Sequence, residues 1–140
     1  MDDERFRACF EAGLIEPASF RHADHIRLAW VYLRTFGYEE AEGRMREAIR
    51  GLAARAGVPG KYHETLTIAW MRLVAAAIAL SPRASTFDAF SRAHGWLLDK
   101  GAIGDYYGAE RLASAQARAG WVDPDLRELP PVPRRPAAAA

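Results

Sequence analysis

The chain has 140 residues, the usual size of a single domain and enough to enclose a hydrophobic core. Half of its residues are apolar and its formal net charge is +1, which argues against a disordered chain and against a nucleic-acid-binding surface. The longest apolar stretch, residues 68–80, contains Arg72 and is too short to span a bilayer. We therefore expect a soluble protein whose partner is a small-molecule substrate or ligand, with neither nucleic acid nor membrane as a partner.

Three features bear on where the protein resides. The N-terminal residues MDDERF are acidic and lack the basic region and apolar core of a secretory signal. Cys9 is the only cysteine of the sequence, so it forms no internal disulfide, which is typical of a reducing compartment. Lys61 and Lys100 are the only lysines, and this preference for arginine, with abundant alanine, is typical of a GC-rich genome. We expect a cytoplasmic bacterial protein.

Helical periodicity continues through most of the chain, and no stretch alternates apolar and polar residues as a strand does. Glycine and proline residues separate the helical segments. The predicted helices cover residues 3–12, 21–36, 38–56, 62–81, 85–101 and 108–119. The fold class is therefore all-α, a single-domain bundle of five to six helices at residues 1–121. Residues 122–140 are rich in proline and alanine, so we expect a flexible, mostly unstructured tail.

All four histidines fall on the apolar side of a predicted helix: His22, His25, His63 and His94. In the second predicted helix, two of them share the apolar stripe that contains Ile26. In the fourth, Thr65 and Arg72 mark the expected exposed side, and the histidine points away from it. Each histidine taken singly is more typical of a core residue bonded to a backbone carbonyl than of a functional group.

The predicted topology brings three of these histidines together. Short connections make successive helices antiparallel, so the second and fourth helices run parallel and begin at the same end of the bundle. His22, His25 and His63 all lie near those beginnings and are expected to converge. Tyr106 or Tyr107 is expected over the same opening, whereas the fourth histidine lies about two helical turns deeper.

A metal site is the first interpretation of this cluster. His-x-x-His places the imidazoles of His22 and His25 on one helix face, where a single metal ion can bridge them. With His63 the set becomes three histidines, which suits zinc, copper or iron. Glu64 lies at the edge of the inward face and is placed to ligate, to orient a histidine or to act as a base. No organic cofactor is indicated.

Two further interpretations use the same part of the chain. A histidine that titrates near neutral pH, together with Glu64, Tyr107 and Asp24, forms a metal-free acid–base set for isomerisation, dehydration or cyclisation of a small molecule. In the other interpretation the histidines are structural and the chain is a non-catalytic interaction module. Asp24 is a less certain member of the acid–base set, because the helical wheel places it away from His25 and its position suits the helix N-terminus.

Two conspicuous features are expected to be structural. The loop 57–61 contains glycines and Lys61 but is too short for a phosphate-binding loop, and no strand precedes it. The aromatic residues of the helices, Trp70 among them, are typical of a packed core rather than of a cofactor pocket.

Two segments of the sequence carry a resemblance. FRHADHIRLAW, at residues 20–30, contains an F-x-H-x-D-H element, and KYHETLTIAW, at residues 61–70, contains Y-H-E-T. Both resemble segments of small bacterial all-helical proteins whose activity is uncharacterised, and the likeness covers most of the helical body without the tail. It implies that five residues belong together: His22, Asp24, His25, His63 and Glu64. It implies no named enzyme family.

Overall fold

The structure is a computed structural model that describes residues 1–133, and in this part of the chain the regular secondary structure is helical, with no strand. Its α-helices are α1 (Asp3–Glu11), α2 (His22–Phe36), α3 (Tyr38–Arg55), α4 (Glu64–Leu80), α5 (Phe87–Ala93), α6 (Ala109–Leu112) and α7 (Ala115–Ala119). Short 3₁₀ turns connect them: η1 (Pro17–Ser19), η2 (Pro59–Lys61), η3 (Gly95–Leu98) and η4 (Lys100–Asp105). The predicted all-α fold class is confirmed.

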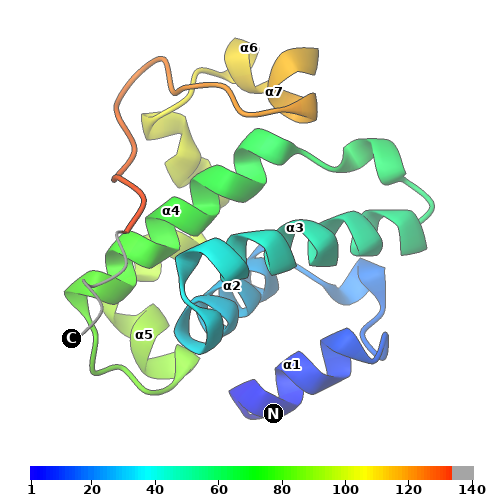
Figure 1. Cartoon of the computed structure of the whole chain (residues 1–140), viewed down its shortest axis with the longest axis vertical. Helices are drawn as coiled ribbons and strands as arrows, with labels where there is room; N and C mark the ends of the chain where they lie inside the picture. The colour runs from blue at the N-terminus through cyan, green and yellow to red at the C-terminus, as the bar shows by residue number, and fades with distance from the viewer. Residues whose placement is uncertain (134–140) are drawn as a thin grey trace.

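The long helix α2 is the centre of the bundle. It packs against α3, α4 and α1, and α3 runs back along it so that α2 and α4 point the same way (Figure 1). Its buried residues lie all around the helix rather than on one stripe: Ile26, Leu28, Ala29, Trp30, Val31, Tyr32 and Leu33. A helix that is buried on every side is surrounded by other elements. The beginnings of α2 and α4 therefore lie at the same end of the bundle, as the short connections predict.

The fifth predicted helix, residues 85–101, is wrong in its second half. The α-helix ends at Ala93, and two 3₁₀ turns, η3 and η4, follow it. His94 leaves the helical region with φ −130° and ψ 50°, and its Nε2 lies 2.8 Å from the Ser81 hydroxyl. Gly95 follows at once and has the lowest helix propensity after proline. A hydrogen bond to another element and a glycine together end the helix earlier than the apolar pattern predicts.

The sixth predicted helix, residues 108–119, is divided into α6 and α7. Ser114 lies at the break with extended dihedral angles and caps α7 by accepting a hydrogen bond from the Ala117 N–H. Serine competes for backbone groups in this way, so it begins helices more readily than it continues them. Across residues 1–133, no helix is both long and apolar enough to cross a membrane.

One face of α4 that was expected to be exposed is covered. Thr65 is fully buried, donates its hydroxyl to the Gly120 carbonyl at 2.7 Å and accepts the Val122 N–H at 3.1 Å. Arg72 is half-buried, with its guanidinium 4.8 Å from the centre of the Trp121 ring. The helical wheel of α4 alone misplaced this face, because residues 120–122, about 50 positions later in the chain, pack on it.

The beginning of the predicted tail is attached to the bundle. Residues 122–133 form no helix, but Leu129 is buried and the Leu126 N–H donates to the Tyr106 carbonyl. Asp125 accepts the Gly108 N–H at 2.8 Å. Residues 122–129 therefore pack against the helical bundle. The part of the tail prediction that concerns residues 134–140 lies outside the described residues.

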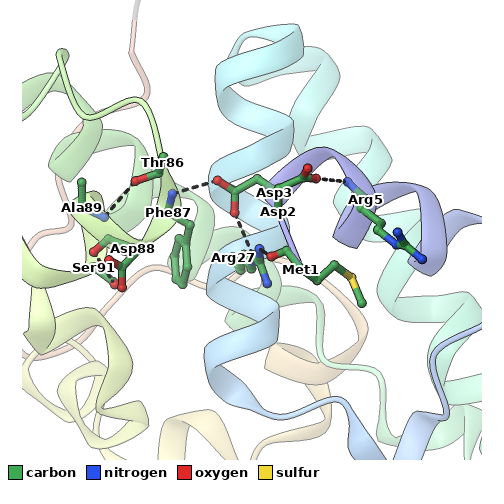
Figure 2. Close-up of polar contacts among 10 residues, drawn as sticks. All are labelled: Met1, Asp2, Asp3, Arg5, Arg27, Thr86, Phe87, Asp88, Ala89 and Ser91. Carbon is green, nitrogen blue, oxygen red and sulfur yellow. Dashed lines mark hydrogen bonds and ion pairs between the residues drawn. The ribbon is translucent and has the colours of Figure 1, made fainter.

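A single carboxylate holds α1 against the rest of the molecule. Asp3 accepts a hydrogen bond from the Arg27 side chain of α2 at 2.8 Å and one from the backbone N–H of Phe87, at the start of α5, at 2.9 Å (Figure 2). The Arg27 guanidinium also lies 4.5 Å from the centre of the Phe6 ring. Because Asp3 contacts two elements that are distant in sequence, it joins three helices at one point.

We expect Asp3→Ala to lower the free energy of unfolding by about 2 kcal/mol, since it removes one partly buried ion pair and one hydrogen bond to charge. Urea denaturation followed by circular dichroism measures the change. Asp88→Ala is the matched control, because its ion pair with Arg92 is exposed, and its effect should stay within about 0.5 kcal/mol. Equal effects of the two substitutions would contradict the linking role of Asp3.

Candidate functional site

A cavity of about 570 Å³ lies at the end of the bundle where α2 and α4 begin. Its walls come from α2, α3, α4, η2, η4 and α6, and most of the side chains that line it are apolar. They include Ile26, Ala29, Met45, Ile49, Leu66, Trp70, Met71, Ile103 and Leu112. The volume falls within the range of about 300–1,000 Å³ that is usual for small-molecule sites. His22, His25 and His63 all line this cavity, so the structure brings together the three histidines that the topology predicts to converge.

His22 lies in the first turn of α2 with one ring nitrogen already bonded. Its Nε2 lies 2.9 Å from the Leu97 carbonyl, which can only accept, so Nε2 carries the proton and donates. Its ring packs edge-on against Trp70, with centroids 4.7 Å apart. Burial lowers the pKa of His22; the bond to Leu97 opposes this shift, and the charge of Lys100 adds to it. At neutral pH this leaves Nδ1 as the acceptor of a neutral ring.

His25 is one helical turn further along α2 and is the least engaged of the three. Its ring packs edge-on against Phe20, with centroids 4.7 Å apart. Within residues 1–133 its ring nitrogens make no hydrogen bond to another protein group. The pKa of His25 is lowered to about 4, mainly by burial and to a smaller extent by the neighbouring His22, while Asp24 opposes the shift. His25 therefore presents a neutral imidazole to the cavity with both nitrogens free to meet a ligand.

His63 has no free nitrogen. It is the N-cap of α4 rather than a residue within the predicted helix, and its Nδ1 accepts the Leu66 N–H at 3.0 Å. Its Nε2 donates to the Leu112 carbonyl at 2.7 Å. Both bonds require the neutral tautomer with the proton on Nε2. His63 thus caps α4 and fastens α6 to it. It lines the cavity, but both of its ring nitrogens are already hydrogen-bonded to backbone groups.

The predicted three-histidine metal set is not formed by this geometry. In the described part of the chain, no group of three or more His, Cys, Asp or Glu side chains is placed to hold a metal ion. A third ligand from His63 requires that it give up its bond to Leu66 or to Leu112. A metal ion here would have two protein ligands, the rings of His22 and His25, fewer than protein zinc sites usually supply.

Glu64 and Asp24 are both committed elsewhere and do not line the cavity. Glu64 lies at the junction of α3 and α4, where it forms an ion pair with Arg46 at 2.8 Å and accepts the Tyr62 hydroxyl at 2.5 Å. Asp24 accepts the Arg21 N–H at 2.9 Å and thereby caps the start of α2. The structure thus gives both predicted acid–base residues local structural partners, and Asp24 has the capping position that its place in the sequence indicates.

The remaining predicted members also lie away from the cavity. Tyr107 is buried and donates its hydroxyl to the Val122 carbonyl at 2.7 Å, and burial raises its pKa to about 12. A phenol with that pKa keeps its proton at neutral pH and remains a hydrogen-bond donor. Through the bond to Val122, Tyr107 anchors the segment after α7. His94 is buried beside Phe90, with ring centroids 5.1 Å apart. Its inward position agrees with the helical wheel, and it joins α5 to the end of α4 through Ser81.

Sequence reasoning missed two cationic residues of the site. Lys61 in η2 and Lys100 in η4 are both exposed and both line the cavity. The sequence pattern predicts only a turn at Lys61 and no role for Lys100. Trp70, expected to be a core aromatic, also forms part of the wall beside His22. The available signal was that the sequence uses lysine at two positions and arginine at every other basic position.

No family model matches this chain, and no curated protein or solved structure is significantly similar to it.

Proposed function

We propose that the chain binds a small, largely apolar organic molecule in the histidine-lined cavity and that His22 and His25 bind its polar group. The observation that carries the proposal is the placement of the His25 imidazole. It is a polar ring, unbonded within residues 1–133, on the wall of a cavity whose other lining is mostly apolar. Because this ring is half-buried and no atom of the described chain bonds its nitrogens, a ligand that enters the cavity can supply the hydrogen bond that the protein does not.

The chemistry that this pair supports best is metal-free acid–base catalysis on the bound molecule. The free Nδ1 of His22 and the unprotonated nitrogen of His25 can each accept a proton, and both rings are neutral at pH 7 because burial lowers their pKa values. His25, with a pKa of about 4, is a weak base in the empty cavity. A ligand that brings negative charge beside it raises its basicity towards the useful range.

We also propose that the protein is cytoplasmic, because its single cysteine is typical of a reducing compartment.

A metal-assisted reaction is the alternative, in which His22 and His25 hold the ion with ligand or solvent atoms completing its coordination. Metal analysis of protein purified without an affinity tag, after reconstitution with zinc, copper or iron, separates the two versions. Near-stoichiometric metal that is lost in His25→Ala favours the metal-assisted reaction.

We expect the neutral dye N-phenylnaphthylamine to bind the wild-type protein saturably at one site, because the cavity offers apolar walls and a hydrogen-bond acceptor. Ile49→Trp, which fills the cavity from α3, should weaken this binding by at least about tenfold. Dye fluorescence measures the affinity. The shift of the His25 ring signals in the NMR spectrum on dye binding locates the dye at that residue.

The matched control uses a second cavity of about 630 Å³ at the opposite ends of α2 and α4. Ile78 lines that cavity and is half-buried like Ile49, so Ile78→Trp makes the same change at the other end of the bundle. Unchanged dye binding in Ile78→Trp supports the assignment. Loss of binding in Ile78→Trp and not in Ile49→Trp, or His25 signals that stay unmoved at saturation, would refute the proposed binding site.

A further inference from the structure

The two lysines of the chain line the same cavity. Lys61 and Lys100 are 39 positions apart in sequence, yet both line the histidine-containing cavity from its exposed side. Lys100 lies close enough to His22 for its charge to disfavour the protonated imidazole. Both lysines come from short 3₁₀ turns, η2 and η4, that flank the opening. The Arg118 side chain donates to the Lys61 carbonyl at 3.2 Å and fastens one of these turns.

Within residues 1–133 the two ammonium groups at this opening are not held in ion pairs, although the charge of Asp99 acts on His22 in the opposite sense to that of Lys100. None of the described residues that line the cavity is acidic. Of the nearby carboxylates, Glu64 is paired with Arg46, whereas Asp99 and Asp24 accept backbone N–H groups and keep their negative charge. Two ammonium groups therefore remain available to a ligand.

The beginnings of two long helices add to this potential. First-turn residues of α2 and α4 line the cavity, so the positive ends of two helix dipoles lie at it. The other cavity, at the opposite helix ends, is lined by Glu39, Glu40 and Glu42, of which Glu40 and Glu42 form ion pairs with Arg44 and Arg46. The molecule thus has one apolar cavity with a cationic opening and one with an acidic lining. A negatively charged ligand is favoured at the first over the second.

We propose that the ligand of the histidine-lined cavity is an organic anion, an apolar body that occupies the cavity and a carboxylate, sulfonate or phosphate group held at its opening by Lys61 and Lys100. This inference rests on the proposed function and specifies the class of molecule. The apolar body buries against Ile49 and Trp70, and the acid group lies within reach of His22. An anion there also offsets the cost of protonating an imidazole, which couples ligand binding to proton uptake.

The test uses two dyes that share the same rings and differ in one acid group. Anilinonaphthalene sulfonate carries the sulfonate, whereas N-phenylnaphthylamine is neutral. We expect the double substitution Lys61→Gln, Lys100→Gln to weaken sulfonate binding by about tenfold and to leave binding of the neutral dye within about twofold. Raised salt should reproduce part of the loss in the wild-type protein, because the lysines are exposed.

The control substitution Arg5→Gln, Arg83→Gln removes the same charge from two exposed positions that do not line the cavity. Sulfonate binding that falls equally in this control and in the lysine variant reflects net charge and overturns the inference. Sulfonate binding that is indifferent to the lysines, with the neutral dye still bound beside His25, also overturns it and leaves the proposed function standing. Failure of the neutral dye to reach His25 counts against the proposed function itself. Lysine-dependent sulfonate binding beside His25 upholds the anion site in either case.

Discussion

Replacement of His63 by alanine should destabilise the protein by about 2–4 kcal/mol. The substitution removes the cap of α4, which is worth about 1 kcal/mol, and leaves the Leu112 carbonyl without its donor, which costs about 1–3 kcal/mol more. Urea denaturation measures the effect as a lower midpoint with an unchanged slope. A histidine that served only as a metal ligand or proton carrier at a bundle end would show a much smaller change.

Two further variants identify the cause. His63→Asn retains a good N-cap side chain that is too short to reach the same carbonyl in the same way, so it should recover about 1 kcal/mol. His22→Ala also leaves one backbone carbonyl without its donor but removes no helix cap, so it should cost about 1 kcal/mol less than His63→Ala. If His63→Ala proves no more destabilising than His22→Ala, the structural assignment of His63 is wrong.

The sequence predicts most of the fold because its first four helices are locally determined. Apolar periodicity and terminal signals place α1 to α4 within two residues of their observed bounds, Gly37 has a positive φ of 76° between α2 and α3, and short connections give the parallel α2 and α4. The segment after Ser85 is less predictable, since His94 bonds to Ser81 at the end of another helix where α5 ends, and Ser114 begins a new helix within the apolar pattern. Periodicity alone contains no information on those partners.

For the same reason the sequence predicts which histidines reach the candidate site but not which of their nitrogens are free. Helix spacing and topology suffice to bring His22, His25 and His63 to one cavity. Whether a ring nitrogen is free depends on where the backbone carbonyls of Leu97 and Leu112 lie, and these come from segments 49 to 75 positions away in sequence. Lys61 and Lys100 reach the site from irregular turns that carry no periodic signal.

Lowering the pH from 7 to 4 should remove about 3 kcal/mol of stability through His25 alone. Burial lowers the pKa of its imidazole to about 4 in the folded protein, against an ordinary value of 6.5 in the unfolded chain. Between these values the unfolded state binds the proton and the folded state does not, so the free energy of unfolding falls as the pH falls. The penalty is absent above about pH 6.5 and complete below about pH 4.

Carboxylates titrate in part of the same range, so the contribution of His25 is measured as a difference between two proteins. His25→Leu has a similar size, suits a helix and cannot be protonated. The difference in free energy of unfolding, His25→Leu minus wild type, should become about 3 kcal/mol more favourable to the variant when the pH falls from 7 to 4. Urea denaturation of both proteins at each pH measures it. NMR titration of the His25 ring should show a midpoint near pH 4 in the free protein and a higher midpoint when anilinonaphthalene sulfonate is bound. A constant difference between the two proteins across this range would mean that His25 is solvated, and the cavity would then lose the unbonded polar group on which its proposed function depends.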